Sequence, residues 1–422
     1  MSELSYLEKL LDGVEVEWKT LEDITLRTSN IKWREVIRSY RYIDLTSVDI
    51  ATKKITETTE ITKNNAPSRA QKLVDENDVI FATTRPTQQR FCLIDSEYAG
   101  EVASTGYCIL RAKQDQVLPK WILHWISTSD FKKHVEENQS GSAYPAISDS
   151  KVKECLIPIP CPDNPEKSLA IQSEIVRILD KFTALTAELT AELTAELNMR
   201  KKQYNYYRDQ LLSFDNEDVP HLPMGQKDIG EFIRGGTFQK KDFMDAGVGC
   251  IHYGQIYTYY GTYAKKTKTH ISATLAKKCK KAQKGNLIIA TTSENDEDVC
   301  KAVAWLGSED IAVSSDACIY KHNLNPKYVS YFFQTEQFQN QKRQYITGAK
   351  VRRVNADNLS KILIPVPSME IQERIVSILD KFDTLTNSIT EGLPREIALR
   401  QKQYEYYRDL LFSFPKPETV SN

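Results

Sequence analysis

The chain has 422 residues, of which 41% are hydrophobic and 27% are charged. This length exceeds one ordinary core, and the composition predicts two or more folded domains rather than a disordered chain. The 56 lysines and arginines nearly balance the 57 aspartates and glutamates, which counts against a uniformly basic nucleic-acid-binding surface. No apolar run approaches the roughly 20 residues of a membrane helix, and the first residues lack the pattern of a signal peptide, so we expect a cytoplasmic protein.

The first elements are a short N-terminal helix and a globular domain. Residues 5–12 (SYLEKLLD) resemble residues 206–213 (YYRDQLLS), which predicts that a helix within residues 1–13 packs on the end of the C-terminal helix. Residues 14–167 form the first domain. Strands are predicted at 78–84 and 106–110, and a helix at 120–135, from β-branched runs and helical spacing.

Residues 168–214 are predicted to form a long helix. They contain neither Gly nor Pro from Leu169 to Phe214, and apolar residues recur at helical spacing. Ser168 is placed as its N-cap. The helix contains three tandem Thr-Ala-Glu-Leu units at residues 186–197. One unit adds about 6 Å and about 40° to a helix, while one base pair of DNA advances about 3.4 Å and turns about 34–36°.

The same plan then repeats. Residues 215–367 form a second domain, with strands predicted at 286–292 and 316–321 and a helix at 327–341. Residues 368–414 form a second long helix, capped by Ser368 and kinked or interrupted near Gly392 and Pro394, and residues 415–422 are a tail.

The two long segments are duplicates. SLAIQSEIVRILDKF (168–182) matches SMEIQERIVSILDKF (368–382), and RKKQYNYYRDQLLSF (200–214) matches RQKQYEYYRDLLFSF (400–414), both at an offset of 200. Weaker matches relate the domains, as between Gly141-Ser142-Ala143 and Gly348-Ala349-Lys350. Similar scaffolds with different surfaces predict two modules that perform one task on two different targets, and the helices most simply pack as an antiparallel pair.

Motifs for catalysis are missing. The chain has no phosphate-binding loop, HExxH or GxSxG motif, and its eight cysteines and six histidines lack the spacing of a zinc site. We therefore expect reduced thiols and no bound metal. A self-sufficient DNA methyltransferase would need a cofactor loop and an (N/D)PP(Y/F) motif, neither of which is present. A structural coiled-coil adaptor and a divergent DNA-binding protein remain the alternatives.

The duplicated segments and the Thr-Ala-Glu-Leu repeat together resemble one family. The chain is similar to DNA-specificity subunits (S subunits) of type I restriction-modification enzymes, in the branch with TAEL repeats (type IC-like), over nearly its whole length. The resemblance implies an α+β fold with two target-recognition domains, separated by two long antiparallel coiled-coil helices in a pseudo-twofold arrangement. It also implies a non-catalytic subunit that reads a bipartite, asymmetric DNA site.

The same resemblance implies partners. Two modification subunits would methylate adenine with S-adenosylmethionine, and restriction subunits would translocate and cleave DNA with ATP and Mg²⁺. This chain would bind double-stranded DNA but no cofactor, metal or membrane. Repeat number would set the spacing of the half-sites, with Thr186, Leu189, Thr190, Leu193, Thr194 and Leu197 as the spacer residues.

Candidate DNA contacts follow from chemistry and position. Phosphates bind Lys and Arg, guanine suits Arg, and adenine suits Asn or Gln. In the first domain the candidates are Ser68, Arg69, Arg85, Gln88, Gln89, Arg90, Ser142 and Tyr144. In the second domain they are Tyr253, Tyr257, Ser293, Lys350, Arg352 and Arg353, with Lys265, Lys266 and Lys268 as phosphate clamps. A solvated charge or a role in the fold is the alternative for each.

Overall fold

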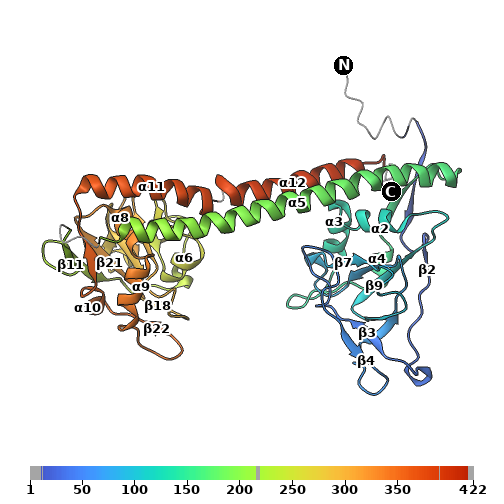
Figure 1. Ribbon diagram of the computed structural model, residues 1–422, viewed down its shortest axis with the longest axis horizontal. Helices are drawn as coiled ribbons and strands as arrows, with labels where there is room; N and C mark the ends of the chain where they lie inside the picture. Colours follow the sequence, from blue (N-terminus) through green and yellow to red (C-terminus); the bar gives the residue numbers. More distant parts are fainter. Residues whose placement is uncertain (1–10, 12, 215–218, 389, 417–422) are drawn as a thin grey trace. The chain divides into compact units, whose positions relative to one another are not determined.

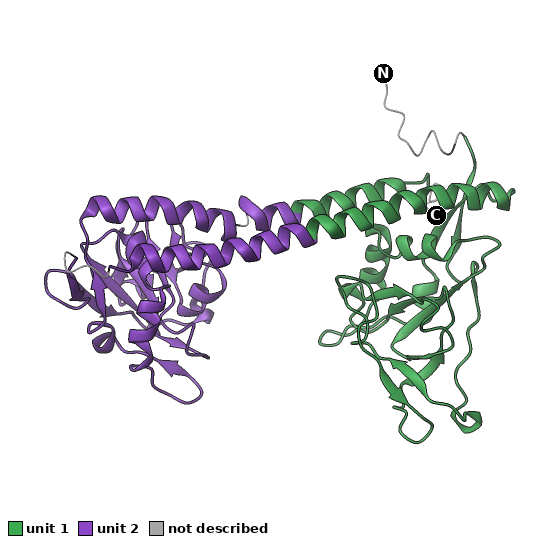
Figure 2. Ribbon diagram, viewed as in Figure 1, with its two compact units in different colours: residues 1–190, 399–422 green, residues 191–398 purple. Residues whose placement is uncertain are grey.

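The computed structural model describes residues 11, 13–214, 219–388 and 390–416 (Figure 1). The chain separates into two compact units, coloured in Figure 2: unit 1 comprises residues 1–190 and 399–422, and unit 2 comprises residues 191–398. Each unit combines sheets with short helices and with parts of the long helices. The predicted α+β class with two similar domains is confirmed.

Unit 1 contains two 4-stranded sheets and one strand pair. The first sheet has the order β2 (Thr25–Leu26), β9 (Tyr107–Ala112), β6 (Val79–Ala82), β7 (Phe91–Leu93). The second has the order β4 (Thr59–Ile61), β3 (Tyr40–Ile43), β8 (Val102–Ser104), β5 (Ala70–Leu73). The strand pair is β1 (Val16–Thr20) with β10 (Leu156–Pro160), antiparallel. Strand β6 reads VIFA and is buried along its whole length, as expected for a strand in the interior of a sheet.

Besides its parts of the long helices, unit 1 contains short helices among the described residues. They are η1 (Trp33–Glu35), η2 (Pro86–Gln88), α2 (Pro119–Trp125), α3 (Ser129–Asn138) and α4 (Asp149–Lys153). The prediction of a single helix at 120–135 is therefore wrong, because α2 ends at Trp125 and α3 begins at Ser129. The hydroxyl of Thr128 accepts a hydrogen bond from the N–H of Phe131 and so caps a new helix.

Unit 2 has the larger set of strands. One sheet has the order β12 (Gly230–Arg234), β21 (Ala317–His322), β17 (Leu287–Ala290), β19 (Ala302–Trp305), β14 (Tyr263–Ala264). Another has the order β15 (Thr269–Ile271), β13 (Val248–Ile251), β20 (Ile311–Val313), β16 (Lys281–Ala282). Two antiparallel pairs are β11 (His221–Pro223) with β23 (Leu363–Pro365), and β18 (Thr292–Ser293) with β22 (Arg352–Arg353). Buried β17 is the counterpart of β6.

Unit 2 also contains several short helices. They are η3 (Lys240–Asp242), α6 (Tyr253–Thr258), α7 (Ala273–Ala276), α8 (Pro326–Phe332), α9 (Glu336–Arg343) and α10 (Ala356–Leu359). The helix predicted at 327–341 is again broken, here by Thr335, whose hydroxyl accepts a hydrogen bond from the N–H of Phe338. The duplication thus extends to the capping residues.

The long helices are α5 (Pro165–Leu212), α11 (Met369–Asn387) and α12 (Gly392–Leu411). Ser168 is not the N-cap of α5, because the side chain of Asn164 accepts from the N–H of Lys167 and Pro165 begins the helix. Ser368 does cap α11. The interruption predicted near Gly392 is confirmed, since α11 ends at Asn387. Gly392 has a φ of +77°, and a Cβ there would lie 2.5 Å from the carbonyl oxygen of Thr384.

Within each unit the long helices pack against one another in antiparallel fashion. In unit 1 the ring of Phe182 on α5 stacks on Tyr407 of α12 with centroids 5.7 Å apart. In unit 2 the ring of Tyr207 on α5 stacks on Phe382 of α11, also at 5.7 Å. The two pairs correspond at the offset of 200, so each unit forms the same aromatic contact from duplicated residues.

The domains attach to these helices through equivalent ionic contacts. Asp180 of α5 lies 2.6 Å from Lys120 Nζ and 2.9 Å from His124 Nε2 of α2. Asp380 of α11 lies 2.6 Å from Lys327 Nζ and accepts a 2.7 Å hydrogen bond from the Tyr331 hydroxyl of α8. Burial opposes ionisation of Asp180, but the hydrogen bonds from His124 and Lys120 outweigh it and lower the pKa.

The remaining expectations concern the N-terminus, the thiols and membranes. The predicted N-terminal helix lies outside the described residues except for Leu11 and Gly13; Leu11 is buried in the same apolar cluster as Leu411, Phe412 and Phe414. All eight cysteines are free thiols. Among the described residues, none of the helices combines the length and apolar character that a membrane-spanning helix requires.

Candidate nucleic-acid interface

Two of the candidate segments of unit 1 lie side by side. The strand-end segment (residues 84–90) follows β6, and the hairpin loop (residues 140–146) is closed by paired Ser140 and Ala146. Thr84 pairs with Ala146, and the N–H of Arg85 donates to the carbonyl of Pro145 at 2.7 Å. The duplicated scaffold therefore brings together residues that are about sixty positions apart in the chain.

Arg85 and Tyr144 form the exposed centre of this surface. The Arg85 guanidinium lies 5.2 Å from the centroid of the Tyr144 ring, a cation–π contact, and Tyr144 is 71% exposed. Arg85 has a φ of +49° and is followed by Pro86 of η2, so the backbone turns sharply at this exposed residue. Both side chains are available to a ligand.

Other candidates of unit 1 divide into exposed residues and residues that support the fold. Exposed positions are Ser68, Arg69, Gln88 and Ser142. Arg90 is a fold residue, because its Nη1 donates to the carbonyls of Leu45 and Val48, both at 2.7 Å. Half-buried Gln89 accepts a hydrogen bond from the Lys53 ammonium through its backbone carbonyl. Burial lowers the pKa of Lys53 to about 8.

Unit 2 builds the same pair of segments from different side chains. Its strand-end segment (residues 292–298) and its hairpin loop (residues 347–353) meet where Thr292 pairs with Arg353 and Ser293 with Arg352. Thr347 pairs with Arg353 and closes the loop. Gly348 has a φ of +91°, matching Gly141 at +93°, so both hairpin loops begin with a turn that requires glycine.

Three basic residues lie on this hairpin loop. Lys350 and Arg353 are exposed. The Nε of Arg352 forms a 2.8 Å ion pair with Asp296, and its Nη1 donates to the carbonyl of Gly348 at 2.6 Å. Sequence reasoning did not identify Asp296, although aligning the duplicated domains would have placed its segment opposite residues 86–90.

The aromatic candidates of unit 2 are mostly structural. The Tyr257 hydroxyl donates to the carbonyl of Thr292 at 2.8 Å, and burial raises the pKa of Tyr257. Tyr257 therefore supports the strand-end segment, while Ser293 and Tyr253 are half-buried. The ammonium of Lys268 lies 4.6 Å from the exposed ring of Tyr259. Lys265, Lys266 and Lys268 are exposed between β14 and β15, as a phosphate-binding role requires.

One lysine that precedes the hairpin loop of unit 2 is not on the surface. Lys342 is completely buried, and its ammonium donates to the carbonyl oxygens of Glu297 and Val299 at 3.0 and 2.8 Å. Burial lowers the pKa of Lys342. The Lys342 side chain therefore holds the end of the strand-end segment of unit 2 in place. It does not present its charge at the surface for DNA to contact.

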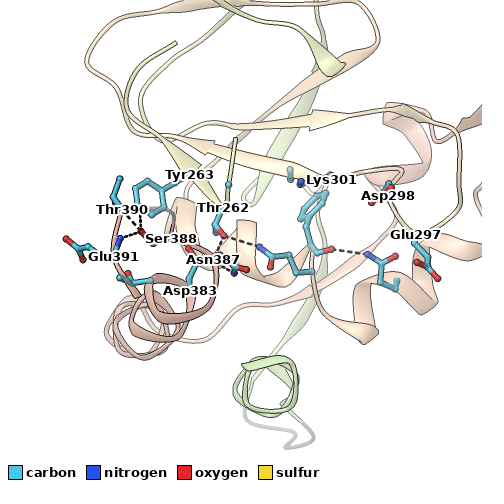
Figure 3. Close-up of a pocket in the computed structure, with 16 residues that line it drawn as sticks. Thr262, Tyr263, Glu297, Asp298, Lys301, Asp383, Asn387, Ser388, Thr390 and Glu391 are labelled. Carbon is cyan, nitrogen blue, oxygen red and sulfur yellow. Dashed lines mark hydrogen bonds between the residues drawn. The ribbon is translucent and has the colours of Figure 1, made fainter. Parts of the chain in front are cut away.

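A pocket of about 820 Å³ in unit 2 lies between the end of α11 and the last residues of the strand-end segment (Figure 3). Its lining includes the carboxylates of Glu297, Asp298, Asp383 and Glu391. Burial raises the pKa of Asp383, which accepts a 2.9 Å hydrogen bond from the amide of Asn387. Carboxylates repel phosphates, so this pocket does not suit the nucleic-acid backbone. Among the described residues no cluster of His, Cys, Asp and Glu could hold a metal ion.

The Thr-Ala-Glu-Leu run lies wholly inside α5, which continues through it without a break. Its three leucines (189, 193 and 197) are half-buried. Thr186 and Thr190 are half-buried and Thr194 is exposed. The run is therefore a regular, uninterrupted segment of α5.

Known proteins match this chain in two parts, one for each of its two similar domains. The family described as "Type I restriction modification DNA specificity domain" matches residues 15–199 and 223–399. The specificity subunit of the Escherichia coli type I restriction enzyme EcoR124I/EcoR124II is 41% identical over 430 residues, with 100% of both chains covered. The EcoprrI specificity subunit of Escherichia coli is 33% identical, covering 93% of both chains. The resemblance seen in the sequence is confirmed, as is the prediction of a non-catalytic subunit.

Solved structures agree with the fold. A chain from a type I R-M system superimposes with a TM-score of 0.71 at 20% identity, covering 94% of this chain and 97% of that chain. The HsdS subunit of Thermoanaerobacter tengcongensis gives a TM-score of 0.54 at 20% identity, covering 94% and 96%.

Proposed function

We propose, from the premise that this chain belongs to the type I restriction-modification DNA specificity family, that its two domains read the two halves of one split, asymmetric DNA site. The observation that carries the proposal is the repeated pairing of a strand-end segment with a hairpin loop. Both domains present the same backbone arrangement with different side chains, Arg85 and Tyr144 in one and Asp296 and Arg352 in the other. Equal scaffolds with unequal surfaces suit two different half-sites.

The interface residues would divide into two roles. Arg85 and Arg352 would contact base edges, because an arginine fork matches the two acceptors of guanine. Exposed Lys265, Lys266 and Lys350 would contact phosphates. Arg90 and Tyr257 would contribute only through the fold, since their polar groups already bind backbone carbonyls.

The chemistry would belong to partner chains. We propose that two modification subunits methylate adenine with S-adenosylmethionine, and that restriction subunits use ATP and Mg²⁺ to translocate and cleave DNA. This chain would bind the DNA and these subunits in the cytoplasm. Exposed aromatic residues that recur on both long helices, Tyr206 (62% exposed) and Tyr406 (63% exposed), suit the docking of two copies of one partner.

The repeat in α5 would act as a spacer. Removing one Thr-Ala-Glu-Leu unit shortens the helix by about 6 Å and turns its remainder by about 40°, which is close to the rise and twist of one to two base pairs. A continuous helix transmits such a change along its whole length.

Mapping adenine methylation in the host genome tests this proposal. In a host with the wild-type gene, adenine should be methylated at one split motif. Deletion of one repeat unit should shorten the spacer of that motif while both of its half-sites stay the same. A changed half-site or an unchanged spacer would refute the spacer role. A methylome that does not respond to deletion of the whole gene would refute the proposed function.

A further inference from the structure

Arg352 is held across the two interface segments of unit 2. Its Nε is 2.8 Å from Asp296 Oδ1 on the strand-end segment, and its Nη1 donates to the Gly348 carbonyl at 2.6 Å on the hairpin loop. The side chain of Arg352 is 35% exposed and that of Asp296 is 55% exposed. These bonds use the Nε–H and one N–H of Nη1, which leaves one N–H on Nη1 and two on Nη2 as further donors.

These remaining donors have the geometry for a base. Guanine offers two acceptors, O6 and N7, in the major groove, and arginine binds both through two parallel N–H groups. Because Asp296 occupies the Nε–H and the Gly348 carbonyl occupies one N–H of Nη1, the remaining N–H groups of Nη1 and Nη2 are the ones left for a ligand. A guanidinium that is already oriented also loses less conformational entropy when it binds.

Unit 1 holds an arginine across the equivalent segments, with the roles reversed. Arg85 comes from the strand-end segment and its partner Tyr144 from the hairpin loop. In unit 2 the arginine comes from the hairpin loop and its partner from the strand-end segment. Both domains therefore place one arginine at the same junction by different means, which argues that the Asp296 contact serves recognition as well as stability.

We infer that Asp296 is a positioning residue that aims Arg352 at a guanine of the second half-site. The inference rests on the proposed function, because it assigns one base and one supporting side chain to that site. Asp296 itself does not touch the DNA in this arrangement. Its carboxylate fixes the Nε side of the guanidinium and thereby selects which N–H groups meet the base.

The strand-end segment of unit 2 also carries Glu294, Glu297 and Asp298. Carboxylates near DNA weaken binding to every sequence, so removal of any one of them should raise affinity in general. Glu294→Gln is the matched control for Asp296→Asn, because it removes one charge from the same exposed segment. Arg352 pairs with Asp296 among the described residues, and Glu294 forms no ion pair with it.

The test compares adenine methylomes of hosts that carry the wild-type gene, Asp296→Asn, Glu294→Gln, Arg352→Ala or a deletion. Full-length proteins are then titrated with duplexes of the mapped site that contain single base-pair changes. Arg352→Ala should lower the preference for guanine at one position by about 5- to 150-fold, the range for a lost bidentate contact. Asp296→Asn should lower it at the same position by at least about threefold and change other positions by less than about twofold.

Glu294→Gln should leave the preference for guanine unchanged. If Asp296→Asn keeps the wild-type motif, or changes affinity for all duplexes to the same degree, the inference is overturned while the proposed function stands. If Asp296→Asn yields no methylation, the duplex titration decides, and a uniform loss there again overturns the inference. If deletion of the gene leaves the methylome unchanged, the proposed function fails and the inference fails with it.

Discussion

The contact between each domain and its helices predicts unequal effects of two equivalent substitutions. Asp380→Ala removes the acceptor of the buried Tyr331 hydroxyl and the partner of Lys327, whose side chain is 19% exposed. An unsatisfied buried donor costs about 1–3 kcal/mol, and a partly exposed ion pair adds about 1 kcal/mol. We expect Asp380→Ala to destabilise unit 2 by about 2–4 kcal/mol.

The equivalent change in unit 1 should cost less. Lys120 is 49% exposed, so its pair with Asp180 is worth at most about 1 kcal/mol. The other partner, His124, loses one hydrogen bond to Asp180, which is worth about 0.5–1.5 kcal/mol. We expect Asp180→Ala to destabilise unit 1 by about 1–2 kcal/mol.

Hydrogen exchange measured by mass spectrometry on the full-length protein separates the two units. Amides of α8 should lose protection in Asp380→Ala, and those of α2 should lose less in Asp180→Ala. Asp380→Asn is the matched control, because it keeps an oxygen for the Tyr331 hydroxyl and should restore about half of the loss. Equal effects at Asp180 and Asp380, or a larger effect at Asp180, would refute this account of the contacts.

Three further changes test other parts of the structure. Burial lowers the pKa of His322 from 6.5 to about 4, so the unfolded chain binds a proton that the folded chain does not; stability should fall by up to about 3 kcal/mol as the pH drops from about 6.5 to 4, and His322→Gln should abolish that part of the pH dependence in urea unfolding. Gly348→Ala should lower stability by about 1–3 kcal/mol, since its Cβ would lie 2.1 Å from the Val351 carbonyl oxygen, whereas Gly261→Ala, with open space around it, should leave the thermal midpoint nearly unchanged. Arg90→Ala should lower the stability by about 1–3 kcal/mol, and with it the thermal midpoint, because two hydrogen bonds are lost. The methylated motif should stay the same, and a changed motif would show that Arg90 reads a base.

The duplication made much of the fold predictable. Central strands β6 and β17 and the interruption near Gly392 follow from runs of apolar residues and from backbone chemistry that a sequence displays directly. The breaks at Thr128 and Thr335 were missed, because helical spacing continues across them and only the capping hydrogen bonds end the first helix. Propensity is a weak guide where one side chain can start a new helix.

The interface was less predictable than the fold. Arg85 and Tyr144 were identified as candidates, but their contact depends on a bridge between residues far apart in the chain. Arg90 and Lys342 look like surface charges in a sequence, yet both are bound to backbone carbonyls. Whether a basic side chain faces solvent or a carbonyl depends on tertiary packing, which composition does not encode.

The paired end strands of each domain have a consequence for inheritance. The chain enters the first domain on β1 and leaves it on β10, with Val16 opposite Pro160, and it enters and leaves the second on β11 and β23, with His221 opposite Pro365. A crossover between two related genes that falls outside such a pair would replace everything between neighbouring backbone positions. The incoming segment needs to begin and end at one antiparallel ladder and to keep the contacts with the long helices, such as that of Lys120 with Asp180. Recombination can therefore create a new DNA preference in a single event, without a series of point mutations that pass through an inactive subunit.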